Sequence, residues 1–189
     1  MHCVAGGARN EALGRRRCWI GTSHACDGAM RISEVLPVQL VLPAIAGRTK
    51  DEVLETLAAR IAEHHPEIDD GRLATALRDR ERQMSTALVE GVAIPHARVA
   101  GLARVVAAFA RSLAGVACDS HDGRPTHLFF VLAAPAEAPG THLKLLATVS
   151  RLLGDERCRA RLMNAADVTA LLAALCEEER RVQQTARAA

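Results

Sequence analysis

Apolar residues recur one helical turn apart directly behind Thr49. The apolar positions of this stretch are Val53, Leu54, Leu57 and Ile61. Thr49 and Glu52 have the spacing of a capping box, in which two side chains bond the free backbone N–H groups at the start of a helix. The pattern predicts a helix that ends near His64, because Pro66 disfavours helical backbone in the residue before it.

A second stretch with helical spacing begins near Asp69 or Asp70. Its inward face carries Leu73, Ala76, Leu77, Arg80 and Met84. An arginine is unusual on an apolar face, and two interpretations of Arg80 stay open. Its stem can pack while its charged end reaches water, or the helix can direct its guanidinium at a specific anion.

Short apolar runs predict strands, and turn residues separate them. The predicted strands are Val38–Leu42, Val92–Ile94, Arg104–Leu113, Val116–Cys118 and His127–Ala133. Asp122-Gly123 is a turn signal between the last two. The run Leu128–Leu132 is apolar at every position, which is typical of a central strand covered by helices on both faces.

The C-terminal part of the chain predicts three more helices. Thr141 can cap a helix that ends at Gly154, and Asp155 and Asp167 can begin two further helices. Together with the strands, these helices predict an α/β fold, with a single mixed β-sheet sandwiched by helices on both faces.

The pattern divides the chain into three parts. Residues 1–29 show no periodicity and contain five glycines, so we expect a flexible N-terminal extension. Residues 30–176 are expected to form one domain with a substantial core. Residues 177–189 are rich in polar side chains, and we expect a polar C-terminal tail that frays, with the charge run Glu177–Arg181 as a solvated helix end.

Composition narrows the class of protein. Hydrophobic residues make up 49% of the 189 residues, and the longest apolar run, Leu128–Ala136, is too short to cross a bilayer. The N-terminus lacks the apolar stretch of a secretory signal, so a soluble cytoplasmic protein is expected. The four arginines and two acidic residues of residues 1–29 account for the net charge of +2. Residues 30–189 are therefore neutral overall, and nucleic acid binding, which needs clustered positive charge, has little support.

The cysteines do not form a recognisable framework. All six are scattered, and none belongs to a Cys-x-x-Cys pair, so reduced thiols are expected. Cys118, His121 and His127 invite comparison with a metal site, but zinc usually takes four convergent ligands at tighter spacing. We therefore predict no metal and no cofactor.

Chemistry is concentrated around His96, in the string Gly91-Val-Ala-Ile-Pro-His-Ala-Arg98. A neutral imidazole is a nucleophile near pH 7 and can carry a covalent phosphoryl group. His142 lies at a predicted helix start, where free N–H groups and the helix dipole favour anions. If the fold brings Arg80 to these histidines, the result is a phosphate pocket around a nucleophile. Without that convergence, His96 is a structural histidine and His142 only caps a helix.

These residues occur in motifs that resemble the enzyme IIA of the bacterial phosphoenolpyruvate:sugar phosphotransferase system, of the mannitol/fructose type. The motifs are Arg80-Glu81, Ser85-Thr86, Gly91–Arg98, Asp122–Pro125 and His142–Ala147, within about residues 30–175. The resemblance implies that His96 is phosphorylated at Nε2, that His142 hydrogen-bonds the phosphoryl group and that Arg80 neutralises it. Thr86 can line the same pocket, although a turn hydroxyl explains this residue equally well.

Within the family, the chain resembles the nitrogen-regulatory enzyme IIA. The resemblance implies a phosphotransferase that receives phosphate on His96 from the histidine-containing phosphocarrier protein (HPr) or its nitrogen-branch counterpart. Phosphorylation then regulates target proteins. The alternative is an enzyme IIA component that passes phosphate to the enzyme IIB of a fructose/mannitol-type sugar permease. No permease domain is fused to the chain, which favours regulation, and no membrane insertion is expected.

Overall fold

A five-stranded mixed sheet lies at the centre of the computed structural model, which describes residues 30–88, 90–137 and 139–188. The strands are β1 (Val41–Leu42), β2 (Val92–Ala93), β3 (His96–Val99), β4 (Val106–Val116) and β5 (Thr126–Pro135). Their order is β1-β4-β5-β2, and β3 also pairs with β5, beyond the end of β2. β4 and β5 are antiparallel, and the other pairs are parallel.

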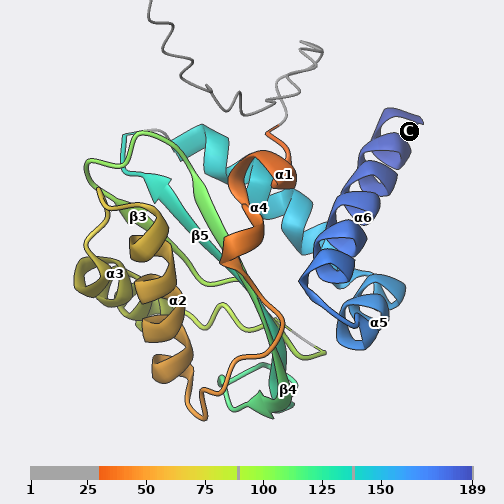
Figure 1. Cartoon of the computed structure of the whole chain (residues 1–189), viewed down its shortest axis with the longest axis horizontal. Coiled ribbons are helices and arrows are strands. Elements are labelled where there is room, and N and C mark those ends of the chain that lie inside the picture. The colour runs from red at the N-terminus through yellow and green to blue at the C-terminus, as the bar shows by residue number, and fades with distance from the viewer. Residues whose placement is uncertain (1–29, 89, 138, 189) are drawn as a thin grey trace, which may run out of the picture.

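Helices cover both faces of this sheet (Figure 1). They are α1 (Ile32–Val35), α2 (Lys50–His64), α3 (Asp70–Gln83), α4 (Pro139–Gly154), α5 (Glu156–Asn164) and α6 (Val168–Ala188), with a 3₁₀ turn, η1, at Val38–Leu40. On one face α2 and α3 pack together, against β4 and β3, and on the other α4 and α6 contact β5 and β1. The predicted single mixed sheet between two helical layers is confirmed.

The central strand is β5, as its uninterrupted apolar run predicts. Every residue from Leu128 to Ala134 is buried. Phe109 of β4 and Phe130 of β5 lie opposite each other in register and pack edge to face, with ring centroids 6.3 Å apart. This pair lies in a core that consists mostly of aliphatic side chains.

The predicted starts of α2, α5 and α6 are present, with one change of hydrogen-bond partner at the start of α2. Thr49 Oγ1 accepts the backbone N–H of Glu52 at 3.2 Å, and α2 ends at His64 as predicted. The Glu52 carboxylate accepts the N–H of Arg48 at 2.8 Å, one residue before the cap position of a standard capping box. Asp155 caps α5, and Asp167 accepts an N–H in the first turn of α6.

The inward face of α3 differs from the prediction at its C-terminal end. Leu73 and Leu77 are buried as expected, but Met84 is 67% exposed and Glu81 is only 6% exposed. Met84 has extended backbone at the end of the helix, so its side chain leaves the helix face. Glu81, four residues after Leu77, takes the buried position instead.

Two strand predictions need correction. Val116 belongs to β4 and not to a separate strand, because β4 resumes its pairing with β5 at Val116 after an irregularity that follows Arg111. Gly115 supplies the positive φ of 79° in this irregular stretch. In the predicted strand 38–42, the first three residues form the 3₁₀ turn and only Val41–Leu42 is a strand.

The predicted polar tail from residue 177 is part of a helix, since α6 continues to Ala188. Glu178 and Glu179 are buried, and Glu179 Oε1 accepts the backbone N–H of Ile32 at 2.7 Å. These two side chains therefore pack against the domain and are not solvated. The expected extension at residues 1–29 lies outside the described residues.

The start of α4 is also earlier than predicted. The helix begins at Pro139, so Thr141 lies inside the first turn and is not the capping residue. The helix ends at Gly154 as expected. Across the described ranges of the chain, every helix is too short or too polar to cross a membrane.

Candidate functional site

Arg80 and His96 meet where α3 packs against the start of β3. Arg80 lies in the last turn of α3, and His96 is the first residue of β3. Nε of Arg80 donates to Nε2 of His96 at 3.2 Å, and Nη1 of the same guanidinium donates to the Met84 carbonyl at 3.0 Å. The charged end of Arg80 is therefore directed at the imidazole, and a snorkelling role does not account for its position.

The second ring nitrogen of His96 is held by the backbone. Nδ1 lies 2.9 Å from the carbonyl oxygen of Ile94, and since a carbonyl can only accept, Nδ1 carries the proton. Nε2 is then the nitrogen with the lone pair, and that lone pair receives the Nε–H of Arg80. The two hydrogen bonds thus fix both the tautomer and the orientation of the ring.

The surroundings of His96 keep the ring neutral. Burial is the main cause that lowers its pKa below the ordinary value, and the charges of Arg80 and His142 lower it further. The hydrogen bond to Ile94 and the charge of Glu81 act in the opposite direction without reversing the shift. A neutral, half-buried imidazole with a lone pair at Nε2 is the form that can act as a nucleophile near neutral pH.

His142 approaches from the other helical layer. It lies in the first turn of α4 and is 5% exposed. The register places Pro135, at the end of β5, beside Val99 of β3, and α4 begins shortly afterwards. This connection brings His142 close enough for its charge to act on the pKa of His96. The three residues that the sequence singles out for one pocket thus come from α3, β3 and α4.

Thr86 is buried, and its hydrogen-bond partner is the carboxylate of Glu81. Its hydroxyl donates to Glu81 Oε2, and its backbone N–H donates to both carboxylate oxygens of Glu81, at 3.0 and 3.1 Å. The hydroxyl proton is therefore used inside the protein. This geometry corresponds to the alternative interpretation of Thr86, as a hydroxyl that holds a turn.

Glu81 belongs to the Arg80-Glu81 motif but is not among the predicted site residues, yet it has several partners beside the site. Besides Thr86, it accepts the hydroxyl of Ser85 at 3.0 Å, and Lys50 Nζ lies 3.6 Å from its Oε1. The signal in the sequence is its spacing, because Leu73, Leu77 and Glu81 recur every four residues on one helix face. A charged residue on that face, next to Arg80, indicates a buried polar contact.

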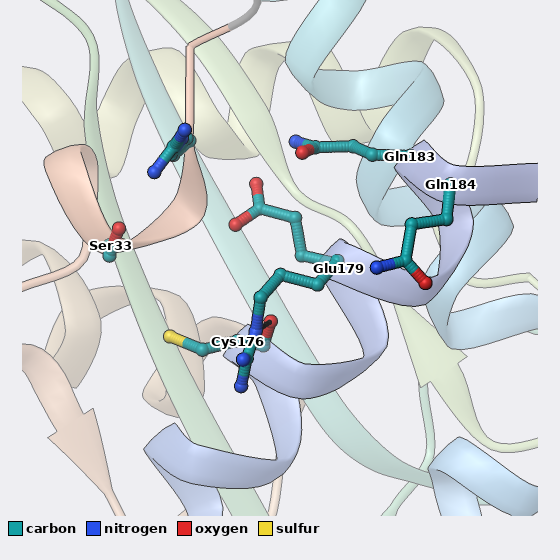
Figure 2. A pocket seen from close by; sticks show the side chains of 7 residues that line it. Ser33, Cys176, Glu179, Gln183 and Gln184 are labelled. Atoms are coloured by element: carbon teal, nitrogen blue, oxygen red, sulfur yellow. Dashed lines mark hydrogen bonds between the residues drawn. The ribbon is translucent and has the colours of Figure 1, made fainter. Parts of the chain in front are cut away.

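A separate pocket of about 380 Å³ lies between α1 and α6 (Figure 2). Arg31 and Ser33 line it from the N-terminal side, and Cys176, Glu179 and Arg180 line it from α6. Burial raises the pKa of the Glu179 carboxyl, whose Oε1 is bonded to the N–H of Ile32. None of the predicted site residues lines this pocket, so it is distinct from the surroundings of His96.

The residues considered for a metal are used in other ways. His127 Nδ1 lies 2.9 Å from the Ser112 carbonyl, and burial raises the pKa of the Cys118 thiol, which disfavours the thiolate that a metal would need. Within residues 30–188, as far as the structure describes them, no group of three or more His, Cys, Asp or Glu residues is arranged to hold a metal ion.

Comparisons with known proteins identify relatives of this chain. The chain is 34% identical over 146 residues to a nitrogen regulatory protein of Bradyrhizobium diazoefficiens, an alignment that covers 77% of this chain and 95% of the relative. It is 35% identical over 143 residues to the fructose-specific EIIABC component of the phosphotransferase system of Bacillus subtilis. That alignment covers 76% of this chain but only 22% of the much longer relative.

A solved structure and a family model extend the comparison. The crystal structure of the nitrogen regulatory protein IIA-Ntr from Neisseria meningitidis matches with a TM-score of 0.73 and 30% identity, over 76% of this chain and 98% of that one. The model of the family described as "Phosphoenolpyruvate-dependent sugar phosphotransferase system, EIIA 2" matches residues 34–178. The chain therefore belongs to the EIIA 2 family of the phosphoenolpyruvate-dependent sugar phosphotransferase system, whose domains are carriers in phosphoryl transfer.

Proposed function

We propose that this protein accepts a phosphoryl group on Nε2 of His96 from a phosphorylated histidine-containing phosphocarrier protein, and that the phosphorylated and bare forms regulate partner proteins. The observation that carries the proposal is the pair of hydrogen bonds on His96. Nδ1–H is held by the Ile94 carbonyl, so the reactive lone pair belongs to Nε2, next to a guanidinium.

The transfer is an exchange of one P–N bond for another. The lone pair of His96 Nε2 attacks phosphorus while the P–N bond of the donor breaks, and its electron pair returns to the donor ring. Positive charge develops on the His96 ring as the new bond forms. The Ile94 carbonyl, which accepts from Nδ1, stabilises that charge.

In this reaction the Nε–H group of Arg80 changes its hydrogen-bond acceptor. At rest its Nε–H occupies the lone pair of Nε2. When phosphorus bonds to Nε2, the same N–H is freed, and the nearest new acceptor is a phosphoryl oxygen. A guanidinium so placed offsets the negative charge of the phosphoryl group during transfer.

His142 is assigned to the phosphoryl group as a hydrogen-bond donor. It is buried in the first turn of α4 and close enough to influence His96 electrostatically. Thr86 acts indirectly in this proposal, through its bonds to Glu81, and not as a ligand of the phosphoryl group.

The regulatory role is supported by relatives named as nitrogen regulatory proteins that align over nearly their whole length. This chain covers 95% of the nitrogen regulatory protein of Bradyrhizobium diazoefficiens and 98% of the Neisseria meningitidis IIA-Ntr chain. A phosphoryl group adds about two negative charges at the surface and can make or break a docking contact. The alternative, transfer to a fructose/mannitol-type enzyme IIB, is supported by the identity to the fructose-specific component of Bacillus subtilis.

The test is reconstitution with phosphoenolpyruvate, enzyme I and the phosphocarrier. The protein should gain one acid-labile, base-stable phosphate, and His96→Ala should gain none. The exposed His64, on α2, offers the matched control, because His64→Ala should be phosphorylated normally. Phosphate on the His96→Ala variant would overturn the assignment. Rapid loss of the phosphate to a purified sugar enzyme IIB would favour the sugar-transfer alternative over regulation.

A further inference from the structure

We propose that Glu81 is a positioning residue for phosphoryl transfer, because it fastens the helix that carries Arg80 to the hairpin that presents His96. This inference rests on the proposed function of His96. It gives Glu81, the residue that follows Arg80, a role in the same reaction. Glu81 touches neither reacting nitrogen. Its effect is to fix the distance and angle between the guanidinium and the ring.

The carboxylate of Glu81 accepts hydrogen bonds from two neighbouring residues, Ser85 and Thr86. Oε1 accepts the hydroxyl of Ser85 at 3.0 Å and the N–H of Thr86 at 3.0 Å, and Oε2 accepts the same N–H and the Thr86 hydroxyl. Glu81 is 6% exposed, so these bonds lie out of water, where each is costly to lose. The Ser85–Thr86 turn is therefore attached to α3 at the residue that follows Arg80.

A counter-charge accompanies the buried carboxylate. Nζ of Lys50, at the start of α2, lies 3.6 Å from Glu81 Oε1 and 2.9 Å from Asp119 Oδ2. The Cys118 carbonyl lies 3.1 Å from the Ser85 hydroxyl and shares its single proton with Glu81 Oε1, so the turn has acceptors on two sides. This arrangement matches the rule that a buried charge is retained only when it is paired and hydrogen-bonded.

Thr86 starts one arm of a hairpin, and His96 follows the other arm. The carbonyl of Thr86 accepts the N–H of Ile94 at 3.1 Å, and the N–H of Leu88 donates to the Val92 carbonyl at 2.7 Å. The Ile94 carbonyl in turn accepts Nδ1–H of His96. An unbroken series of hydrogen bonds thus runs from Glu81 through Thr86 and Ile94 to the ring.

The consecutive residues Arg80 and Glu81 therefore act on the two nitrogens of the His96 ring. Arg80 contacts Nε2 of His96 directly, and Glu81 sets the peptide that contacts Nδ1. If Glu81 loses its acceptor oxygens, the Ile94 carbonyl is free to drift from Nδ1. The proton on the ring is then no longer confined to Nδ1, and Nε2 is no longer reserved for attack. A displacement of about 1 Å in such a site can cost roughly a hundredfold in rate.

The experiment compares Glu81→Gln and Thr86→Val with two controls. Glu81→Gln replaces an oxygen with an NH₂ group that cannot accept, and Thr86→Val removes only the hydroxyl. Thr86→Ser keeps the hydroxyl and should restore function, and Glu63→Gln makes the same chemical change at an exposed pair with Arg60. We expect Glu81→Gln to slow phosphoryl acceptance by roughly tenfold to a hundredfold. Thr86→Val should slow it less, and both controls should stay within about twofold of the unmodified protein.

A second measurement separates positioning from simple loss of folding. The ¹⁵N resonances of the His96 ring report which nitrogen carries the proton, and they do so without any phosphate. We expect the unmodified protein to show the proton on Nδ1, and folded Glu81→Gln and Thr86→Val to show a mixture of the two tautomers. If Glu81→Gln does not fold, the comparison of Thr86→Val with Thr86→Ser alone tests the positioning role.

The outcomes are distinguishable. A folded Glu81→Gln protein with unmodified tautomer and unmodified rate would overturn the positioning role. A rate loss equal to the loss of folded protein, with an unchanged tautomer, would also overturn it and leave Glu81 a residue of stability only. If the unmodified protein takes no phosphate on His96, the proposed function fails, while the ring resonances still decide whether Glu81 orders the ring.

Discussion

Nε of Arg80 lies 3.2 Å from Nε2 of His96, so the cation of the resting site is bonded to the atom that we propose attacks phosphorus. The bond orients the ring but also occupies the lone pair. Phosphoryl acceptance therefore requires this contact to be exchanged for one to a phosphoryl oxygen. The guanidinium has several N–H donors in one plane, which suits it to that exchange. Its Nε–H can leave His96 Nε2 while Nη1 stays bonded to the Met84 carbonyl.

Replacement of Arg80 tests this exchange. Arg80→Met should slow phosphoryl acceptance by roughly a hundredfold or more, the cost of removing one charged donor from such a site. Arg80→Lys keeps the charge without the planar fork and should fall between that variant and the unmodified protein. Arg82→Met is the control, since Arg82 is exposed on the same helix and pairs only with Asp79. Equal initial rates for Arg80→Met and Arg82→Met would contradict the role of Arg80.

The pH dependence follows from the pKa of His96. Only the neutral ring has a lone pair at Nε2, and the pKa of His96 is lowered, so the ring is protonated only in solutions more acidic than its ordinary value of about 6.5. The rate of phosphoryl acceptance should therefore be flat from about pH 8 down to about 6.5 and decline only in more acidic solution. Because Arg80 contributes to the lowering, Arg80→Met should move this decline to higher pH. A decline centred above pH 7 in the unmodified protein would contradict the prediction.

Gly115 should be far less replaceable than Gly101. Both have a positive φ, of 79° and 80°, so an alanine at either is strained by roughly 1–2 kcal/mol. A Cβ on Gly101 meets nothing within 4 Å, whereas a Cβ on Gly115 would lie 2.8 Å from His127 Cε1 and 2.8 Å from Pro125 Cβ. Gly115→Ala should thus lose roughly a further 1–3 kcal/mol from crowding. Denaturant unfolding of the two variants measures the difference, and equal losses would show that the neighbours of Gly115 yield freely.

Glu179 should contribute to stability although it lies in a stretch of polar sequence. Glu179→Ala leaves the buried N–H of Ile32 without its acceptor, which costs about 1–3 kcal/mol. Glu177→Ala, two residues earlier on α6, removes only an exposed pair with Arg161 and should cost at most about 1 kcal/mol. Free energies of unfolding from urea titration compare the two, and a smaller loss for Glu179→Ala than for Glu177→Ala would contradict the prediction.

Local pattern was enough to place most elements. The helix from Lys50 to His64 follows from one cap, one apolar stripe and one proline, and the burial of β5 follows from its uninterrupted apolar run. The end of α3 could not be predicted in this way. Hydropathy ranks Met84 above Glu81 for burial, and only the partners of Glu81, which come from Lys50, Ser85 and Thr86, reverse that order.

The members of the candidate site could be grouped from the sequence, but their hydrogen bonds could not be predicted from it. Arg80, His96 and His142 carry chemistry that stands out in the sequence, and the resemblance to enzyme IIA supplied the reason to group them. Periodicity gives no information on which ring nitrogen is protonated, because that depends on the position of the Ile94 carbonyl, which is a property of the folded hairpin. The burial of Glu179 could not be predicted for the same reason, since its acceptor role depends on a residue near the other end of the domain.

The hydrogen bond between Ile32 and Glu179 spans 147 positions of sequence, which has a consequence for synthesis on the ribosome. At about 5–20 residues per second, the acceptor is added roughly 7 to 30 seconds after its donor. Until α6 leaves the exit tunnel, the backbone N–H of Ile32 in α1 therefore lacks its Glu179 acceptor. A nascent chain halted before Glu179 can assemble the strands around β5 but not this corner, so the contact between α1 and α6 closes only after Glu179 has been added.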